Sequence, residues 1–328
     1  MARPPSKSKR QYVHVNNGPA QRLARKTAGA KPASMPDYIE PLLATEAPPP
    51  RGEKWLHEIK YDGYRFQLHL KDGQPRFFTR RGNDWSNRVN SLVLASGAIA
   101  SYGCIIDGEV VVPLENGGTD FGALESELKQ SGSDRIAFYA FDLLYLDGLD
   151  LRRAALEHRK EILRLLLDGV PYPIVYSDHM EGDGPTIARQ ACRMELEGIV
   201  SKRREAPYAS GRSGYWIKKP CRSRDTFIVA GWAEKRKKFD GIYLAKKQGR
   251  DLVYAGKLER GFDAAGEKAM LAKLRPLVTG KQPMKASRAR FPKARWVKPL
   301  VKVEAEFRGK TGEGLLRHPS FKGIREDL

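Results

Sequence analysis

The stretch HEIKYDGYRFQLHL at residues 57–70 combines two apolar–polar alternations with an Asp-Gly pair at 62–63. Alternation with a period of two is typical of β-strands, and Asp-Gly between two such runs favours a tight hairpin turn. The sequence therefore predicts two antiparallel strands joined by this turn. Residues two apart on a strand share a face, so Glu58 and Lys60 should point the same way, with Arg65 returning on the next strand.

Similar short alternations continue on both sides of this stretch and define a first folded region at 36–221. The expected strands are 55–61, 64–70, 75–79, 104–112, 136–146, 199–202 and 214–219, and the expected helices are 150–167, with Asp150 as its N-cap, and 185–196. This mixture predicts an α+β class domain, with antiparallel sheets flanked by helices.

The composition changes after Lys219-Pro220, and a second pattern follows at 222–328. Strands are expected at 226–232, 241–247, 251–257 and 296–307, with a helix at 263–277 between them. Four or five strands and one helix in about 100 residues favour a small β-barrel of the OB type. Residues 1–35 are rich in Pro, Lys, Arg and Ala, and we interpret them as a disordered basic arm.

The net charge of +20 is distributed unevenly along the chain. Residues 1–35 hold 8 Lys and Arg and no Asp or Glu, whereas residues 36–221 carry a net charge of −3. Residues 222–328 hold 27 Lys and Arg against 12 Asp and Glu. This segregation favours a polyanionic partner that is held mainly by the second domain. A basic surface kept only for solubility is the alternative, although it gives no reason to spare the central domain.

Features of the sequence also suggest where the protein works. No apolar run approaches the roughly 18 residues of a membrane span, and the basic N-terminus lacks the apolar segment of a secretory signal. The three cysteines, Cys104, Cys192 and Cys221, lie far apart, which fits a reducing compartment. We therefore expect a cytoplasmic protein without a membrane partner.

Polar residues on several other predicted strands suggest that Lys60 is part of a functional site. A lysine beside an Asp-Gly turn is usually an ordinary surface group. However, Asp142 lies inside an apolar strand, where a charge is costly unless it is paired. Each of the other polar sites is weak alone, but their order along the chain is a specific combination: Arg80-Arg81, Asp107-Gly108-Glu109, Phe141-Asp142, Glu197-Gly198 and Trp216-Ile217-Lys218-Lys219.

With these residues in place, the chain resembles the ATP-dependent DNA ligases, and most of all the ligase module of bacterial end-joining enzymes. The resemblance covers residues 36–328, and KYDGYR at 60–65 matches the K-x-D-G-x-R signature of covalent nucleotidyltransferases. It implies that Lys60 attacks the α-phosphate of ATP and holds AMP as a phosphoramidate. An amine with an ordinary lysine pKa of about 10.4 is mostly protonated at neutral pH. Nearby cations such as Mg²⁺, Arg65, Lys218 or Lys202, or partial burial, would therefore have to favour its free form.

The resemblance also implies roles for the surrounding residues and a requirement for Mg²⁺ or Mn²⁺. Glu58 would read the adenine edge, and Phe141 would stack on the base. The remaining implied contacts are Arg65 and Arg80 to ribose or phosphates, Glu109 to ribose or metal, Glu197 and Asp327 to metal, Lys218 to the α-phosphate, and Arg325 with Asp327 to the leaving pyrophosphate.

Two positions depart from the pattern of that family. The strand that reads W-x-K-x-K in the family has Pro220 in place of its second lysine, so we expect Lys219 to substitute through a local bulge, or the phosphate contact to be absent. The last motif usually ends in lysine, whereas this chain ends in Leu328, which could slow self-adenylation.

The sequence thus predicts an ATP-dependent DNA ligase that seals 5′-phosphate/3′-hydroxyl nicks or ends in end-joining repair. Nicked or broken double-stranded DNA is the expected partner, together with a Ku-like end-binding protein, and the chain is expected to be a monomer. An RNA ligase or an mRNA-capping type of nucleotidyltransferase shares the K-x-D-G signature and is the first alternative. A nucleic-acid-binding module that has lost catalysis is the second.

Overall fold

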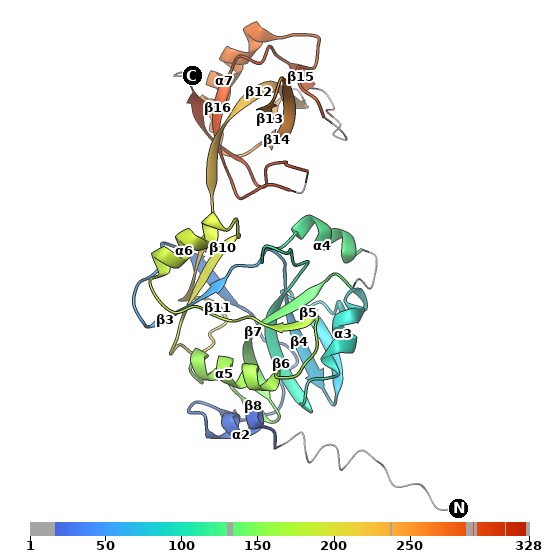
Figure 1. Cartoon of the computed structure of the whole chain (residues 1–328), viewed down its shortest axis with the longest axis vertical. Helices are drawn as coiled ribbons and strands as arrows, with labels where there is room; N and C mark the ends of the chain where they lie inside the picture. Colours follow the sequence, from blue (N-terminus) through green and yellow to red (C-terminus); the bar gives the residue numbers. More distant parts are fainter. Residues whose placement is uncertain are drawn as a thin grey trace, which may run out of the picture. The chain divides into compact units, whose positions relative to one another are not determined.

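A computed structural model of the chain describes residues 17–129, 134–236, 238–286, 291, 294–311 and 313–325 (Figure 1). The chain divides into two compact units, Met1–Pro220 and Cys221–Leu328, one residue before the boundary expected from the sequence. Each unit has its own hydrophobic core. Among the helices in the described ranges, none is long and apolar enough to cross a membrane.

The first unit is built on two sheets. A seven-stranded sheet has the order β1-β8-β7-β6-β4-β5, with β9 also paired to β7, and a four-stranded sheet has the order β2-β11-β10-β3. The strands are β1 (Lys31–Pro32), β2 (Leu42–Glu46), β3 (Trp55–Ile59), β4 (Tyr64–Lys71), β5 (Gln74–Thr79), β6 (Gly103–Val111), β7 (Ala137–Leu146), β8 (Leu149–Asp150), β9 (Ile174–Tyr176), β10 (Gly198–Arg203) and β11 (Gly211–Pro220). The two sheets meet in an apolar cluster that includes Leu42, Ile105, Phe141 and Trp216.

Helices cover the sheets of the first unit. They are α2 (Pro19–Lys26), α3 (Asn90–Ser96), α4 (Phe121–Glu127), α5 (Leu156–Leu166) and α6 (Gly184–Arg193), with a 3₁₀ turn at Ser86–Arg88. Helix α5 packs on β7 and α2 packs on α5, while α6 lies against β10 and β3 (Figure 1). The expected α+β architecture is therefore present.

The connection at Asp62-Gly63 differs from the expected hairpin. Strand β3 pairs with β10 in the smaller sheet, whereas β4 pairs with β5 and β6 in the larger one. The chain therefore crosses between sheets at residues 60–63 instead of folding back on itself. Gly63 permits the crossing, because a Cβ at this position would lie 2.3 Å from the Val110 carbonyl oxygen.

Part of the expected N-terminal arm is ordered. Residues 17–35 contain α2 and β1, and Ala20 and Ala24 of that helix are buried in the main core. Gln21 donates hydrogen bonds to the Ala100 carbonyl and to Asp147, at 2.8 and 2.9 Å. A disordered arm over 1–35 is thus wrong for residues 17–35, because small and polar side chains of the helix find partners in the folded unit. Residues 1–16 lie outside the described ranges.

Two smaller expectations also need correction. Helix α5 begins at Leu156, and Asp150 lies in β8, where its carboxylate accepts hydrogen bonds from Arg152 instead of capping the helix. Cys104 is buried with a free thiol, whereas Cys192 and Cys221 are disulfide-bonded, so the thiols are not all reduced as the spacing suggested.

The second unit is a six-stranded antiparallel sheet with one helix. Its strands follow the order β14-β13-β12-β16-β17, and β15 pairs with β12. They are β12 (Ser223–Lys235), β13 (Lys238–Gln248), β14 (Asp251–Leu258), β15 (Ala294–Trp296), β16 (Lys302–Phe307) and β17 (Ser320–Arg325), with helix α7 (Ala264–Leu274) and a 3₁₀ turn at Arg275–Leu277. Among the described residues the two edges meet only through an isolated bridge between Arg260 and Ser320, so no closed barrel forms.

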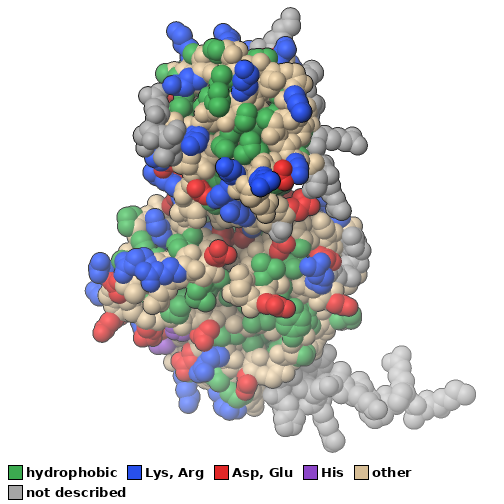
Figure 2. Space-filling model, turned by 45° about the horizontal axis from the view of Figure 1, so that its top comes forward, with side chains coloured by type: hydrophobic (Ala, Val, Ile, Leu, Met, Phe, Trp, Pro, Cys, Tyr) green, Lys and Arg blue, Asp and Glu red, His purple; other side chains and the backbone are tan. Residues whose placement is uncertain are grey.

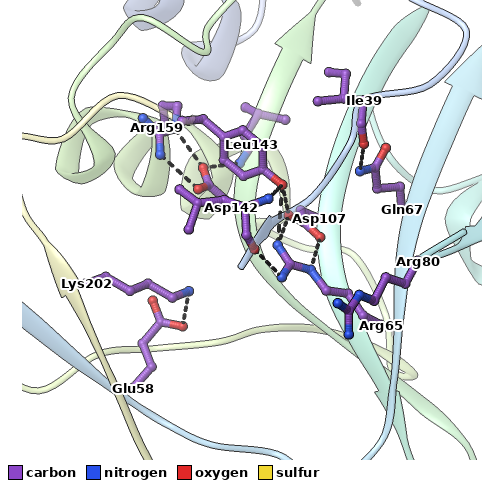
Figure 3. A network of polar contacts seen from close by, with 12 residues as sticks. Ile39, Glu58, Arg65, Gln67, Arg80, Asp107, Asp142, Leu143, Arg159 and Lys202 are labelled. Carbon is purple, nitrogen blue, oxygen red and sulfur yellow. Dashed lines mark hydrogen bonds and ion pairs between the residues drawn. The ribbon is translucent and has the colours of Figure 1, made fainter. Parts of the chain in front are cut away.

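A fully buried ion pair ties α5 to β7 in the first unit. Arg159 donates two hydrogen bonds to Asp142, at 2.7 and 2.8 Å, and both side chains are wholly inaccessible to solvent (Figure 3). Arg159 also donates to the carbonyl oxygens of Ala154 and Ala206. The charge inside the apolar strand is therefore paired, as the sequence required, and it fixes the strand position next to Phe141.

We predict that Arg159→Met destabilises the first unit by roughly 3–5 kcal/mol, because it leaves the Asp142 carboxylate buried without its cation. Urea unfolding followed by circular dichroism measures the loss. The matched control is Arg164→Met, an exposed arginine on the same helix, which should cost little. The double variant Arg159→Met/Asp142→Leu should recover much of the stability, and equal losses for Arg159→Met and the control would contradict the prediction.

Candidate active site

A pocket of about 140 Å³ opens between the two sheets of the first unit. Strands β2, β3, β10 and β11 contribute from the smaller sheet, and β4, β6 and β7 contribute from the larger one. The lining residues are Ala44, Glu58, Ile59, Lys60, Tyr61, Arg65, Glu109, Phe141, Val200, Lys202, Trp216 and Lys218. Six of the residues predicted for the site therefore line one cavity: Glu58, Lys60, Arg65, Glu109, Phe141 and Lys218.

Lys60 stands at the crossing between the sheets. Its ammonium donates a hydrogen bond to Glu197, forming an ion pair in which both side chains are mostly shielded from solvent. Its backbone N–H donates to the Gly198 carbonyl at 2.9 Å. Gly198 has a φ of +145°, and a Cβ there would lie 2.2 Å from the Lys219 carbonyl, so only glycine lets β10 begin here. This geometry sets Glu197 beside Lys60.

Arg65 enters the pocket from the larger sheet with its orientation fixed. Its guanidinium donates to both carboxylate oxygens of Asp107, at 2.9 and 2.6 Å, and to the Leu42 carbonyl at 2.6 Å (Figure 3). Tyr208 donates a further hydrogen bond to Asp107 at 2.6 Å. Asp107 is wholly buried, so Arg65 presents a fixed positive charge at the pocket wall.

Glu109 is the carboxyl group whose titration is most affected by the pocket. Burial raises the pKa of Glu109 to about 8, although the positive charges of Arg65 and Lys60 oppose that shift. The neighbouring carboxylates Glu197 and Asp107 add to the rise. A bound divalent cation would favour the ionised form of this group.

Glu58 is held between two buried lysines. Lys160 of α5 lies 2.8 Å from one carboxylate oxygen, and Lys202 of β10 lies 2.7 Å from the other. Burial lowers the pKa of Lys202 to about 8, despite the opposing pull of Glu58. Burial also acts to lower the pKa of Lys160, but its ion pair with Glu58 outweighs this and the net shift is upward. Figure 3 shows Glu58 and Lys202 facing each other, joined by this contact.

Two aromatic rings border the same space. Phe141 and Trp216 meet edge to face, with ring centroids 5.7 Å apart. The Lys202 ammonium lies 4.1 Å from the Phe141 centroid and 4.3 Å from that of Trp216, and the Arg65 guanidinium is within 5.3 Å of both. A flat, electron-rich base could pack against these rings while cations approach its edge.

Two of the proposed contact residues in the first unit, Arg80 and Lys219, do not line the pocket. Arg80 is exposed and outside the pocket lining, although its backbone carbonyl accepts a hydrogen bond from Tyr38 at 2.7 Å. Lys219 is exposed, and β11 pairs with β10 in continuous register from Trp216 to Pro220, so the bulge expected there is absent. Arg325 ends β17 in the second unit. Asp327 lies outside the described residues.

The residues present suit a divalent cation that keeps most of its other ligands from water or phosphate. Glu109 and Glu197 supply hard carboxylate oxygens beside Lys60. In the described ranges no group of three or more His, Cys, Asp or Glu side chains gathers around one point. Mg²⁺ and Mn²⁺ are commonly bound through one or two carboxylates and substrate phosphates, so this donor set fits them.

Sequence reasoning gave no role in the site to Lys160 or Trp216, and it treated Lys202 only as a nearby cation. Lys160 shares the buried face of α5 with Leu156 and Leu163, at helical spacing, and this was a usable signal. In the strands, Lys202 lies two residues after Val200 and Trp216 lies two before Lys218, so alternation predicts that each pair shares a face.

Comparisons with known proteins agree with this geometry. Residues 39–219 match the family described as ATP dependent DNA ligase domain, and residues 235–328 match the ATP dependent DNA ligase C terminal region. These matches together span most of the chain, which belongs to the ATP-dependent DNA ligase family. The expected α+β nucleotidyltransferase fold and the OB-type second unit are thereby confirmed.

Two individual relatives show how much of the chain is similar to known ligases. The chain is 36% identical over 323 residues to the multifunctional non-homologous end joining protein LigD of Pseudomonas aeruginosa, covering 94% of this chain and 38% of that protein. It is 27% identical over 292 residues to the SPbeta prophage-derived DNA ligase-like protein LigB of Bacillus subtilis, covering 88% and 99%. The chain thus spans less than half the length of the LigD proteins it matches.

Solved structures point the same way. A mycobacterial DNA ligase D complexed with ATP and MES is 26% identical, with a TM-score of 0.56, and the match covers 89% of this chain and 96% of that one. The ligase domain of LigD from M. tuberculosis is 27% identical, with a TM-score of 0.51 and the same coverage.

The neighbouring lysines of β11 provide a matched pair for testing the site. We predict that Lys218→Ala weakens ATP binding at least about tenfold, because a charged hydrogen bond is worth about 1.5–3 kcal/mol. Lys219→Ala should leave the affinity within about twofold, since its side chain is exposed and outside the pocket. Isothermal titration calorimetry with ATP, on each variant in a Lys60→Ala background, measures the two affinities. Equal losses of affinity in the two variants would place Lys219 in the site and contradict the prediction.

Proposed function

We propose that this chain is an ATP-dependent DNA ligase that joins 5′-phosphate and 3′-hydroxyl ends through a lysyl-AMP and a DNA-adenylate. The observation that carries the proposal is the convergence of Lys60, Glu197 and Glu109 at one point between the two sheets. A nucleophilic amine, carboxylates suited to a metal and fixed cations occur there together. Family membership agrees with this reading.

In the first step the Lys60 amine attacks the α-phosphorus of ATP. A P–N bond forms, the P–O bond to the β-phosphate breaks, and pyrophosphate leaves while the amine loses a proton. Glu197, hydrogen-bonded to the Lys60 ammonium, is placed to orient the amine and to accept that proton. Arg65 and Lys218 line the pocket as positive charges for the phosphate oxygens, on which negative charge accumulates in the transition state.

A divalent cation held by Glu109 and Glu197 would supply further charge neutralisation at the phosphates. In the remaining steps the 5′-phosphate of the DNA takes AMP from Lys60, and the 3′-hydroxyl then displaces AMP. Each step exchanges one bond to phosphorus for another, so no further co-reactant is required.

The Glu58–Lys202 pair supports adenine as the base. Adenine presents an amino donor at N6 next to an acceptor at N1, and a carboxylate beside an ammonium offers the complementary acceptor and donor. Guanine presents the reverse order, with an acceptor at O6 and a donor at N1. The 2.7 Å pair at the pocket floor therefore favours ATP over GTP, and the ion pair with Lys160 keeps Glu58 oriented.

We predict that incubation with ATP and Mg²⁺ adds the mass of one AMP to the chain and that Lys60→Ala abolishes the addition. The matched control Lys71→Ala, an exposed lysine at the end of β4, should still gain AMP. Intact-protein mass spectrometry reads the adduct, and the same mixture is then given nicked DNA or nicked RNA duplex, with GTP as a second nucleotide. If the wild-type chain never gains AMP and does not already carry it, the ligase proposal fails.

We also predict that ATP affinity falls as pH rises through about 8. Lys202 carries its positive charge, and donates its strongest hydrogen bonds, only when protonated, and its depressed pKa of about 8 places the loss of that charge between pH 7 and 9. Fluorescence or calorimetric titration of the Lys60→Ala chain with ATP isolates binding from chemistry. Lys202→Arg keeps its charge over this range, so its affinity should stay nearly constant with pH. An equal fall in both chains would refute a role for Lys202 as donor.

The wider role proposed is end-joining repair in the cytoplasm, as a monomer that acts on nicked or broken double-stranded DNA with a Ku-like end-binding partner. Relatives that are named as non-homologous end joining proteins support it. The basic second unit, with 27 Lys and Arg against 12 Asp and Glu over residues 222–328, suits a phosphate backbone read without regard to sequence. Nick sealing by the full chain, and its stimulation by a co-expressed end-binding protein, test this role.

A further inference from the structure

The reaction described above assigns no task to Tyr208, a buried tyrosine in contact with Arg65. Figure 2 shows Lys, Arg, Asp and Glu side chains that stand at the surface of the first unit on the face drawn. Arg65 is different, because only 14% of its side chain is exposed. A charged group inside a site keeps its orientation only if neighbouring side chains hold it there by packing and hydrogen bonds.

The Tyr208 hydroxyl joins three separate strands of the first unit. It donates a hydrogen bond to the Asp107 carboxylate of β6 at 2.6 Å, and it accepts one from the Leu42 N–H of β2 at 3.0 Å. It also accepts one from the Arg65 guanidinium of β4 at 3.3 Å. A hydroxyl has one donor hydrogen and two acceptor lone pairs, so its hydrogen-bonding capacity is fully used.

The segment that carries Tyr208, between β10 and β11, is anchored on α5 and on the turn before that helix. The Ala206 carbonyl accepts hydrogen bonds from the Leu156 N–H and from the Arg159 guanidinium, each at 3.1 Å. The Tyr208 N–H donates to the Arg152 carbonyl at 2.7 Å. These contacts are made outside the pocket, so the position of the hydroxyl does not depend on a bound substrate.

The hydroxyl also keeps its proton. Burial raises the pKa of Tyr208 well above its usual value, and the neighbouring Asp107 carboxylate adds to the rise. The positive charge of Arg65 acts in the opposite direction without reversing the shift. Tyr208 is therefore a permanent donor to Asp107 near neutral pH.

The frame around Arg65 leaves it one donor to offer. Its Nε and Nη2 atoms donate to Asp107, and Nη1 donates to the Leu42 carbonyl at 2.6 Å. Nη1 carries a second N–H, for which the residues in the described ranges supply no acceptor. Tyr208 contacts every member of this frame, since it bonds to Asp107, to the Leu42 N–H and to the guanidinium itself.

We propose that Tyr208 is a positioning residue that acts through Arg65 in the first step of the reaction. By fixing Asp107 and Leu42, its hydroxyl keeps the remaining N–H of Arg65 aimed at the phosphate oxygens on which negative charge accumulates. Fixed donors of this kind stabilise a transition state because they need no rearrangement when the charge appears. The inference deepens the proposed function and rests on it for the identity of the reacting phosphate.

The test compares Tyr208→Phe with Tyr145→Phe in the full chain. Both rings are 6% exposed and belong to the same apolar cluster, but the Tyr145 hydroxyl donates to the Ala33 carbonyl and does not line the pocket. The rate at which saturating ATP adds AMP is followed by rapid quenching and intact-protein mass spectrometry. Each variant is also made in an Arg65→Lys background, which keeps a positive charge beside Asp107 but lacks the planar fork.

Tyr208→Phe should slow AMP addition about tenfold, the factor that a lost hydrogen bond to a charged group represents. In the Arg65→Lys background the same change should alter the rate less than about twofold, because the group that Tyr208 positions is already gone. Tyr145→Phe should leave the rate near its starting value in both backgrounds. A Tyr208→Phe effect of equal size in both backgrounds, or one no larger than that of Tyr145→Phe, overturns the proposal.

A second measurement does not depend on the chemistry. Nitrogen-15 NMR of arginine side chains reports how freely the Arg65 guanidinium rotates, and Arg65→Lys assigns its signal. Tyr208→Phe should speed this rotation and Tyr145→Phe should not, whereas unchanged rotation in both would sink the idea. If the wild-type chain never gains AMP but the rotation responds as expected, the ligase proposal fails while the positioning of Arg65 by Tyr208 stands.

Discussion

The crossing of the chain from one sheet to the other at residues 60–63 is the constraint on which the candidate active site depends. Strand β3 delivers Glu58 from the smaller sheet, Lys60 follows at the crossing, and β4 delivers Arg65 on the larger sheet after only a few residues. So short a passage requires close backbone contact, which Gly63 allows beneath the Val110 carbonyl. A hairpin would have kept these side chains on one sheet, with no cavity between two walls.

The pocket contains many charges, and several of them are held by partners that are themselves fixed. Isolated buried charges are costly, so Arg65 relies on Asp107 and Tyr208, and Glu58 relies on Lys160 and Lys202. The resulting groups are oriented before any substrate arrives. Because the groups are already oriented, they need no reorganisation during the reaction. Such preorganisation is the main source of electrostatic catalysis.

Much of this could be predicted from the sequence, because strand alternation and the order of motifs are local signals. Strands β3 to β7 and six of the lining residues follow from them. The pairing of β3 with β10 could not be predicted, since Asp-Gly is equally compatible with a hairpin and with a crossing. Lys160 and Lys202 were missed as members of the site because charged residues usually lie on surfaces. Only their ion pairs with Glu58, which is distant in sequence, explain their burial.

The two units handle charge in opposite ways, and this separates their responses to salt. In the first unit the charges that matter are buried pairs a few ångströms apart, which ions in solution screen weakly. In the second unit the excess charge is exposed, as at Arg260 and Arg308, so it would attract the proposed polyanionic partner through water. Interactions of that kind weaken steeply with ionic strength. On the proposed function, nucleotide binding in the first unit would therefore depend less on salt than the binding of a phosphate backbone by the second unit.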